Sequence, residues 1–120
     1  MLKSKLRILN DVLILRLDGE FDQHYTKDLR ENVTELLTKY NLHVLAIDMC
    51  KCTFIDSSAI GFIIGRYNYL RGIKGKIILY NLNPIIEKII MLSGIYKICE
   101  ISKETIHFEE IGVYNEQIQR

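Results

Sequence analysis

The chain has 120 residues, of which 48% are apolar, so its size and composition fit one domain with a packed core rather than two domains. Its 16 Lys and Arg residues nearly balance 15 Asp and Glu residues, and a net charge of +1 speaks against a nucleic-acid partner. The longest charge-free run, residues 77–86, is about half the ~20 residues of a membrane span, and the N-terminus lacks the apolar core of a signal peptide. We therefore expect a cytoplasmic protein without a membrane contact.

The first 40 residues predict a β-hairpin followed by a helix. Apolar and charged residues alternate at 5–8, Asn10 and Asp11 form a turn signal, and an apolar run follows at 12–17. After this hairpin, apolar residues recur every three or four positions, as in an amphipathic helix with one buried stripe. The stripe comprises Tyr25, Leu29, Val33, Leu36, Leu37 and Tyr40.

The rest of the chain predicts alternating strands and helices. The expected elements are an interior strand at 43–49, a helix at 57–71, a strand at 75–80, a helix from Pro84 to about 92, and a strand at 96–101. The apolar stripe of the helix at 57–71 comprises Ile60, Ile63, Ile64, Tyr67 and Leu70. This order implies an α/β fold with a mixed sheet, whose later strands are joined by right-handed crossovers. We expect the domain to span residues 1–106 and assign no structure to the tail, 107–120.

Polar segments follow three of the expected strands: DGEFDQH at 18–24, DSS at 56–58 and NLNP at 81–84. In open α/β sheets, the loops that leave the carboxyl ends of the strands form the functional edge. We therefore expect the functional residues of this protein in these segments.

The segment Asp56-Ser57-Ser58 stands at the start of a predicted helix. The simplest interpretation is a helix cap, because Asp and Ser side chains accept hydrogen bonds from the free N–H groups of a first turn. A cap does not require two serines followed by the small residues Ala59 and Gly61, which leave a surface that another protein's active site could approach. A phosphate on a serine here would face those N–H groups, so the helix should survive phosphorylation.

Two catalytic interpretations are weaker. A serine hydrolase with Ser58 as nucleophile and His24 as base would lack the flanking glycines of a nucleophile elbow. Asp48, near the end of a predicted buried strand, could be a receiver-type phosphoacceptor, but a receiver opens with a strand, a helix and a strand rather than a hairpin. Gly61 and Gly65 do not form a phosphate-binding loop, and we expect them to permit close helix packing.

Two metal interpretations also remain open. The acidic residues Asp18, Glu20 and Asp22 could bind a divalent cation, although a polar turn explains them equally well. Cys50 and Cys52 would face one side of a continuing strand. A metal site there would need further ligands, such as His43 or His107, so we expect these two residues and Cys99 to be free thiols.

Three motifs together resemble the STAS-domain anti-sigma factor antagonists, and within them the sporulation branch. They are DGEFD at 18–22, FIDSSAIGFIIGRY at 54–67 and NPIIEKIIMLSGIYKI at 83–98, and the resemblance covers residues 2–104 in order and spacing. The DSS-x-x-G-x-x-x-G-R-Y pattern is specific to members that are phosphorylated. The resemblance implies a STAS fold and a regulator rather than an enzyme.

The resemblance also implies a partner switch. The unphosphorylated antagonist would bind an anti-sigma factor that is also a serine kinase, and so release a sporulation sigma factor. The kinase would phosphorylate the second serine, Ser58, and a metal-dependent serine phosphatase would reverse this. ATP and magnesium would belong to the kinase, so no cofactor or metal is expected in this chain. The implied partner-binding residues are Asp22, Asp56, Ser57, Ala59, Ile60 and Gly61.

Alternatives within the fold are an antagonist for a stress-response sigma factor, or a subunit of a transport or lipid-handling assembly in which the serines only cap the helix. The chain departs from the family pattern at two positions. Ala59 replaces a glycine after the second serine, and Phe21 replaces a smaller aliphatic residue beside the same site. Both departures predict slower phosphorylation or a changed choice of partner.

Overall fold

The computed structural model describes residues 2–103, so the predicted tail at 107–120 lies outside the described residues. In chain order the elements are β1 (Lys3–Leu9), β2 (Val12–Phe21), α1 (Gln23–Lys39), β3 (Val44–Ile55), α2 (Ser57–Arg71), β4 (Lys76–Tyr80), α3 (Pro84–Ser93), the 3-10 helix η1 (Ile95–Lys97) and β5 (Glu100–Ile101). The predicted hairpin, the three helices and the interior strand are confirmed.

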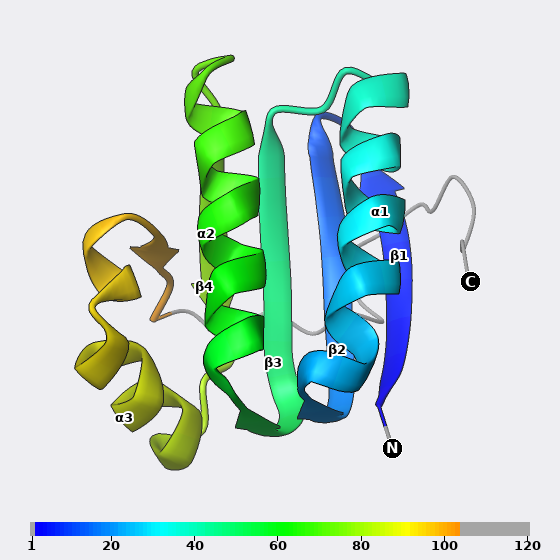
Figure 1. The fold of residues 1–120 in the computed structure, drawn as a ribbon. Coiled ribbons are helices and arrows are strands. Elements are labelled where there is room, and N and C mark those ends of the chain that lie inside the picture. Colours follow the sequence, from blue (N-terminus) through cyan, green and yellow to red (C-terminus); the bar gives the residue numbers. More distant parts are fainter. Residues whose placement is uncertain (1, 104–120) are drawn as a thin grey trace.

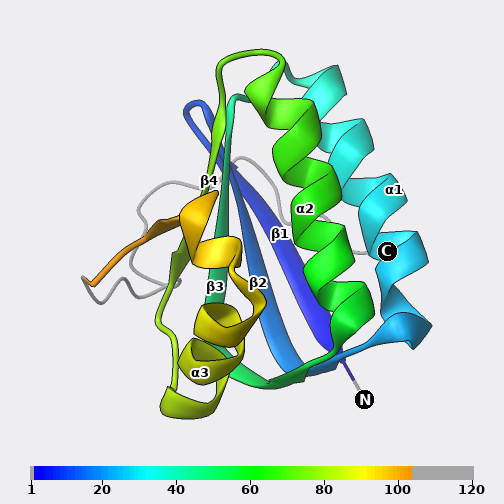
Figure 2. The same ribbon diagram turned by 60° about the vertical axis from the view of Figure 1, so that its left-hand side comes forward.

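The five strands form one mixed sheet in the order β1-β2-β3-β4-β5, with β1 antiparallel to β2 and the other neighbours parallel. Helices α1 and α2 lie side by side on one face of this sheet, and α3 lies near the end of the sheet at which β3 runs into α2 (Figures 1 and 2). Because β2, β3 and β4 are parallel, their carboxyl ends share that edge. The predicted α/β fold with an opening hairpin is confirmed.

The core lies between the sheet and the helix pair. Leu45, Ile47 and Met49 of the central strand are fully buried, and α1 buries Leu29, Val33, Leu36 and Leu37 as predicted. Tyr40, predicted to end the α1 stripe, is 47% exposed because it lies just beyond the helix as its C-cap.

The predicted stripe of α2 is only partly right. Ile63 and Leu70 are fully buried, but Ile64 is 40% exposed, and Phe62 is buried in its place. Helix α2 packs against α1 as well as against the sheet, which rotates its buried face relative to a simple amphipathic stripe. The expectation that Gly61 and Gly65 permit close packing is wrong, because a Cβ atom at either position would meet no atom within 4 Å.

Strand β3 continues to Ile55 and contains a β-bulge. Arg16 and Asp18 of β2 pair with Asp48 and Lys51, so two β3 residues lie opposite one β2 residue. The bulge reverses the side-chain alternation, and Cys52 is therefore buried while Cys50 is exposed. The prediction that these two cysteines face the same side is wrong. The carboxylate of Asp48 accepts a hydrogen bond of 3.0 Å from the Cys50 N–H within the bulge.

The predicted strand at 96–101 is shorter than expected. Gly94 ends α3 with a φ of 82°, in the left-handed region that glycine adopts most easily, and the chain then forms η1 before the two residues of β5. Sequence periodicity cannot separate a single 3-10 turn from a short strand in a run this brief.

The three cysteines differ in predicted reactivity. Burial raises the pKa of the Cys52 thiol to about 11 and that of Cys99 to about 12, whereas Cys50 is exposed. Because only the thiolate reacts, a thiol reagent should label Cys50 rapidly in the native protein and should label Cys52 and Cys99 only after unfolding. A kinetic thiol assay of the wild type and Cys50→Ser measures this. Persistence of the rapid phase in Cys50→Ser would show that the buried thiols are open to solvent.

Candidate functional site

The ends of β2, β3 and β4 each lead into a helix whose N-cap is a polar residue. The side chains of Asp22, Asp56 and Asn83 accept hydrogen bonds from the first turns of α1, α2 and α3, respectively. The three polar segments therefore lie where the sequence predicts them. Asp18 and Glu20, however, belong to β2 and not to a loop, because the strand runs to Phe21.

Hydrogen bonds connect these segments to one another. The Asp56 N–H donates to the carbonyl of Phe21 at 3.4 Å, and the Gln23 N–H donates to Asp56 Oδ2 at 3.2 Å. The Asn83 side-chain amide donates to the carbonyl of Cys52 at 2.8 Å. The starts of the three helices are thus fixed relative to the end of β3.

Asp56 is the centre of this network. Its Oδ1 accepts a hydrogen bond of 2.7 Å from the Ser58 hydroxyl and one of 3.0 Å from the Ala59 N–H. Desolvation by burial acts to raise the pKa of Asp56, but the hydrogen bonds from the Ser58 hydroxyl and from backbone N–H groups outweigh it and lower the pKa. The carboxylate is therefore ionised at neutral pH, and it places a negative charge beside both serines.

The two serines have different surroundings. Ser57, the first residue of α2, is exposed, and its hydroxyl forms no hydrogen bond among residues 2–103. Ser58 is partly buried, and its hydroxyl donates to Asp56. Asp56 is the residue that caps the helix, so neither serine is needed as an N-cap.

The other residues expected to bind a partner are only partly at the surface. Asp22 and Ile60 are partly buried, and Gly61 is exposed. Ala59 is fully buried, so its methyl group packs in the core and not on a partner. Phe21 is also fully buried and packs edge-on against Phe62, with 5.2 Å between ring centroids. The Phe21 ring is therefore part of the core and not of the exposed surface, although the Phe21 carbonyl contacts the Asp56 N–H.

The structure does not bring together the residues that the two catalytic interpretations, a serine hydrolase and a receiver-type phosphoacceptor, would require. The ring of His24 is exposed and bonded through Nδ1 to Asp22 at 3.0 Å, and the Ser58 hydroxyl points to Asp56 instead of a histidine. Asp48 is 1% exposed, and its Oδ1 accepts hydrogen bonds from Cys50 and Asn81, so it is not an accessible phosphoacceptor. Within the described chain no cluster of three or more His, Cys, Asp or Glu residues could hold a metal ion.

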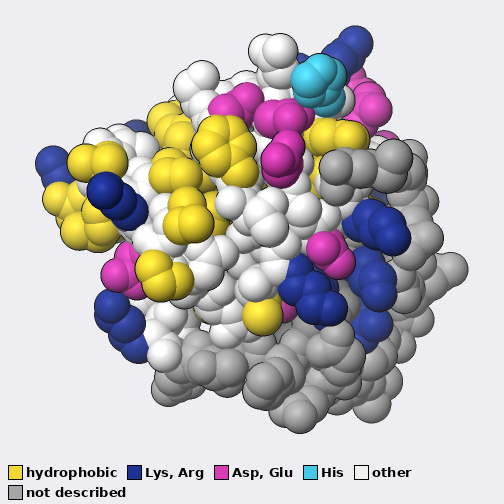
Figure 3. Space-filling view, turned by 90° about the horizontal axis from the view of Figure 1, so that it is seen from below, with side chains coloured by type: hydrophobic (Ala, Val, Ile, Leu, Met, Phe, Trp, Pro, Cys, Tyr) yellow, Lys and Arg dark blue, Asp and Glu magenta, His cyan; other side chains and the backbone are white. Residues whose placement is uncertain are grey.

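An exposed apolar surface lies near the end of the sheet at which β3 runs into α2, and the sequence analysis did not separate it from the core. Helix α3 buries Ile86 and Ile90 but leaves Ile85 62% and Leu92 78% exposed, with Ile89 partly buried between them. The spacing of four and three places Ile85, Ile89 and Leu92 on one side of the helix, here called the α3 stripe. Seen from the edge at which β3 ends, hydrophobic side chains gather over α3 and adjoin a group of acidic side chains (Figure 3). Phe54, near the end of β3, is 45% exposed.

The sequence model of the STAS domain matches residues 3–107. The chain belongs to the STAS domain family. One relative, the anti-sigma F factor antagonist of Paenibacillus polymyxa, is 31% identical over 90 residues, which are 75% of this chain and 77% of the relative. None of the helices in residues 2–103 is long and apolar enough to span a membrane.

Solved structures show the same STAS fold. The anti-sigma factor antagonist SpoIIAA in its unphosphorylated form is 22% identical, with a TM-score of 0.72 over 86% of this chain and 90% of that one. The Bacillus cell fate determinant SpoIIAA in the phosphorylated form is 24% identical, with a TM-score of 0.69 over 85% and 93% of the two chains. At these identities the likeness shows the fold alone.

Proposed function

We propose that this STAS domain is an anti-sigma factor antagonist that works by partner switching. In its unphosphorylated form it binds an anti-sigma factor that is also a serine kinase, and so releases a sporulation sigma factor. The observation that carries this proposal is a serine pair at the exposed start of α2, next to an ionised Asp56. The name of the 31% identical relative, an anti-sigma F factor antagonist, supports the same assignment.

The protein is proposed to act as a cytoplasmic substrate and binding partner, not as an enzyme. ATP and magnesium would be held by the kinase, and a metal-dependent serine phosphatase would return the chain to its binding form. This fits a site whose polar groups are occupied by helix capping and by contacts between loops.

We propose Ser58, the residue that the resemblance implies, as the phosphate acceptor. Its hydroxyl donates a charge-assisted hydrogen bond of 2.7 Å to Asp56. A carboxylate that accepts the hydrogen of a serine hydroxyl is placed to act as a general base and to activate the serine oxygen as a nucleophile. Ser57 is exposed, and its hydroxyl is unengaged among the described residues, so Ser57 is the matched control for this assignment.

A phosphate at this position would change the charge of the binding surface more than its fold. Phosphoserine carries about 1.5 to 2 negative charges and would lie beside the ionised Asp56. The N-terminal N–H groups of α2 favour an anion, so the helix should remain intact. A partner that desolvates both anions would pay for their repulsion, and its affinity should fall.

The α3 stripe is proposed to be the apolar part of the same partner-binding surface. Large apolar side chains exposed next to a polar site are typical of protein–protein contacts. The acidic side chains that gather beside the hydrophobic ones on this face of the molecule (Figure 3) predict basic residues on the partner. The serine pair then lies at the border between an apolar contact and a charged one.

Displacement of a sigma factor tests this function. The unphosphorylated chain is added to a preformed complex of a kinase-type anti-sigma factor and its sigma factor, with nucleotide present, and the species are separated by size-exclusion chromatography. We expect free sigma factor and a new complex of the chain with the anti-sigma factor. An unchanged sigma complex at excess chain would contradict the proposal.

A further inference from the structure

We propose that a cationic cavity on the sheet face opposite α1 and α2 binds a small phosphate-bearing anion. The cavity has a volume of about 280 Å³ and is lined by Lys3, Lys5, Arg16, Asp18 and Lys51. These residues come from β1, β2 and β3, and none of them belongs to the serine site. The inference is therefore independent of the proposed partner switch.

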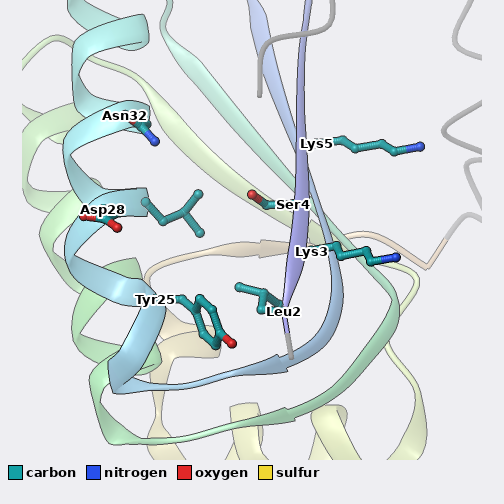
Figure 4. A pocket seen from close by; sticks show the side chains of 8 residues that line it. Leu2, Lys3, Ser4, Lys5, Tyr25, Asp28 and Asn32 are labelled. Atoms are coloured by element: carbon teal, nitrogen blue, oxygen red, sulfur yellow. The ribbon is translucent and has the colours of Figure 1, made fainter. Parts of the chain in front are cut away.

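Strand register explains why these side chains meet. Lys3 and Lys5 of β1 lie opposite Asp18 and Arg16 of β2, and Asp18 in turn lies opposite Lys51 of β3. Residues directly opposite in neighbouring strands have Cβ atoms about 5 Å apart. Lys3 and Lys5 also line a second pocket, between β1 and α1, together with Leu2, Ser4 and Tyr25, but Figure 4 shows their side chains extending from β1 to the side away from α1.

The β-bulge in β3 brings Lys51 to this face. Along β3, Ile47 and Met49 point into the helix-covered core, so regular alternation would send residue 51 there too. The extra residue between Asp48 and Lys51 reverses the alternation, and Lys51 is exposed while Cys52 enters the core. Bulges commonly re-aim a side chain at a functional position.

The cations of the cavity outnumber the nearby carboxylates. Arg16 lies opposite the buried Asp48, which leaves Asp18 as the acidic residue shared by three exposed lysines. Those lysines form no ion pair within residues 2–103. Lys5 and Arg16 are directly opposite each other, an arrangement of like charges that is unfavourable in a ladder. A bound anion with two charges would offset this repulsion.

The size and shape of the cavity indicate the class of ligand. Its volume is slightly below the range of drug-sized ligand sites, which is about 300 to 1,000 Å³. Lysine ammonium groups bind phosphate as point charges, and arginine binds it through paired N–H donors. A phosphoryl or pyrophosphoryl group fits these donors, whereas an extended cofactor does not fit the volume.

Calorimetric titration of the full chain with sodium phosphate and sodium pyrophosphate, at an ionic strength held constant with NaCl, tests this site. We expect saturable binding, and about a tenfold or greater loss of affinity in the double variant Lys5→Gln/Lys51→Gln. Lys27→Gln, an exposed lysine on α1, is the matched control and should bind as the wild type does. All three positions are exposed, so each variant should fold.

Three results would overturn the proposal. The first is the absence of saturable binding to the wild type. The second is an equal loss of affinity in Lys27→Gln, which would show that the loss reflects the net charge of the protein and not a site at these residues. The third is binding to anionic phosphatidylserine vesicles that pyrophosphate does not compete for, which would make the cluster a membrane contact and not a cavity site.

Discussion

Replacing Ser58 with Asp should weaken binding to the anti-sigma factor by roughly a hundredfold or more, while Ser58→Asn binds nearly as the wild type does. The two replacements have similar shape and differ in charge. The added carboxylate lies beside Asp56, which is ionised at neutral pH because its hydrogen bonds lower its pKa. Two desolvated anions at an interface cost several kcal/mol, and each 1.4 kcal/mol is about tenfold in affinity.

The same charge should leave the fold intact. An anion in the first turn of α2 is favoured by the helix dipole, and Asp56 still caps the helix through the Ala59 N–H. Thermal unfolding of Ser58→Asp should therefore remain cooperative, with a midpoint within about 4 °C of the wild type. Binding is measured by calorimetry and unfolding by circular dichroism. Equal affinities of the Asp and Asn variants would show that the added charge does not control binding. Loss of cooperative unfolding in the Asp variant would show that the charge disrupts the fold.

The double variant Ile85→Ser/Leu92→Ser should lose about tenfold or more in affinity for the anti-sigma factor, with little change in stability. Both side chains are more than half exposed, so their removal leaves no cavity in the core. Tyr40→Ser is a matched control, since Tyr40 is also an exposed large apolar residue but lies beyond the far end of α1. The control should bind normally.

A core variant on the same helix separates binding from folding. Ile90 is 1% exposed, and Ile90→Ala should reduce the free energy of unfolding by roughly 2–5 kcal/mol. The folded fraction of Ile90→Ala should bind the partner as the wild type does. If the double variant binds as tightly as Tyr40→Ser, the α3 stripe is not part of the interface.

Much of the fold is predictable from local patterns in the sequence. The opening hairpin, the bounds of α2 and the Pro84 start of α3 each depend on a few neighbouring residues, and the structure confirms them. The interior position of β3 follows from its continuous apolar run. The order of the elements then predicts the mixed sheet. The hairpin gives one antiparallel pair, and the helices between the later strands provide the crossovers that parallel strands require.

The errors have a common physical origin in long-range packing. The β-bulge depends on how β3 pairs with β2, and no local feature of the Cys50 to Cys52 segment shows it. Helix α3 carries two adjacent apolar stripes, and only the contact with the sheet decides that Ile86 and Ile90 are the buried pair. Ala59 was expected to contact a partner because it follows the two serines in the sequence, but its side chain turns into the core.

The resemblance identifies the serine pair but does not show which hydroxyl is free. That distinction depends on the 2.7 Å hydrogen bond between Ser58 and Asp56. An N-cap aspartate followed by two serines is compatible with either side chain bonding to it.

The most direct test of the partner switch is intact-mass spectrometry after incubation with the anti-sigma kinase and Mg-ATP. Wild type, Ser57→Ala and Ser58→Ala are compared under the same conditions. The account predicts one phosphate on the wild type and on Ser57→Ala, and none on Ser58→Ala. A phosphate lost only in Ser57→Ala would contradict the assignment of the acceptor to Ser58. No phosphate on any of the three, with a kinase shown to be active, would contradict the switch itself.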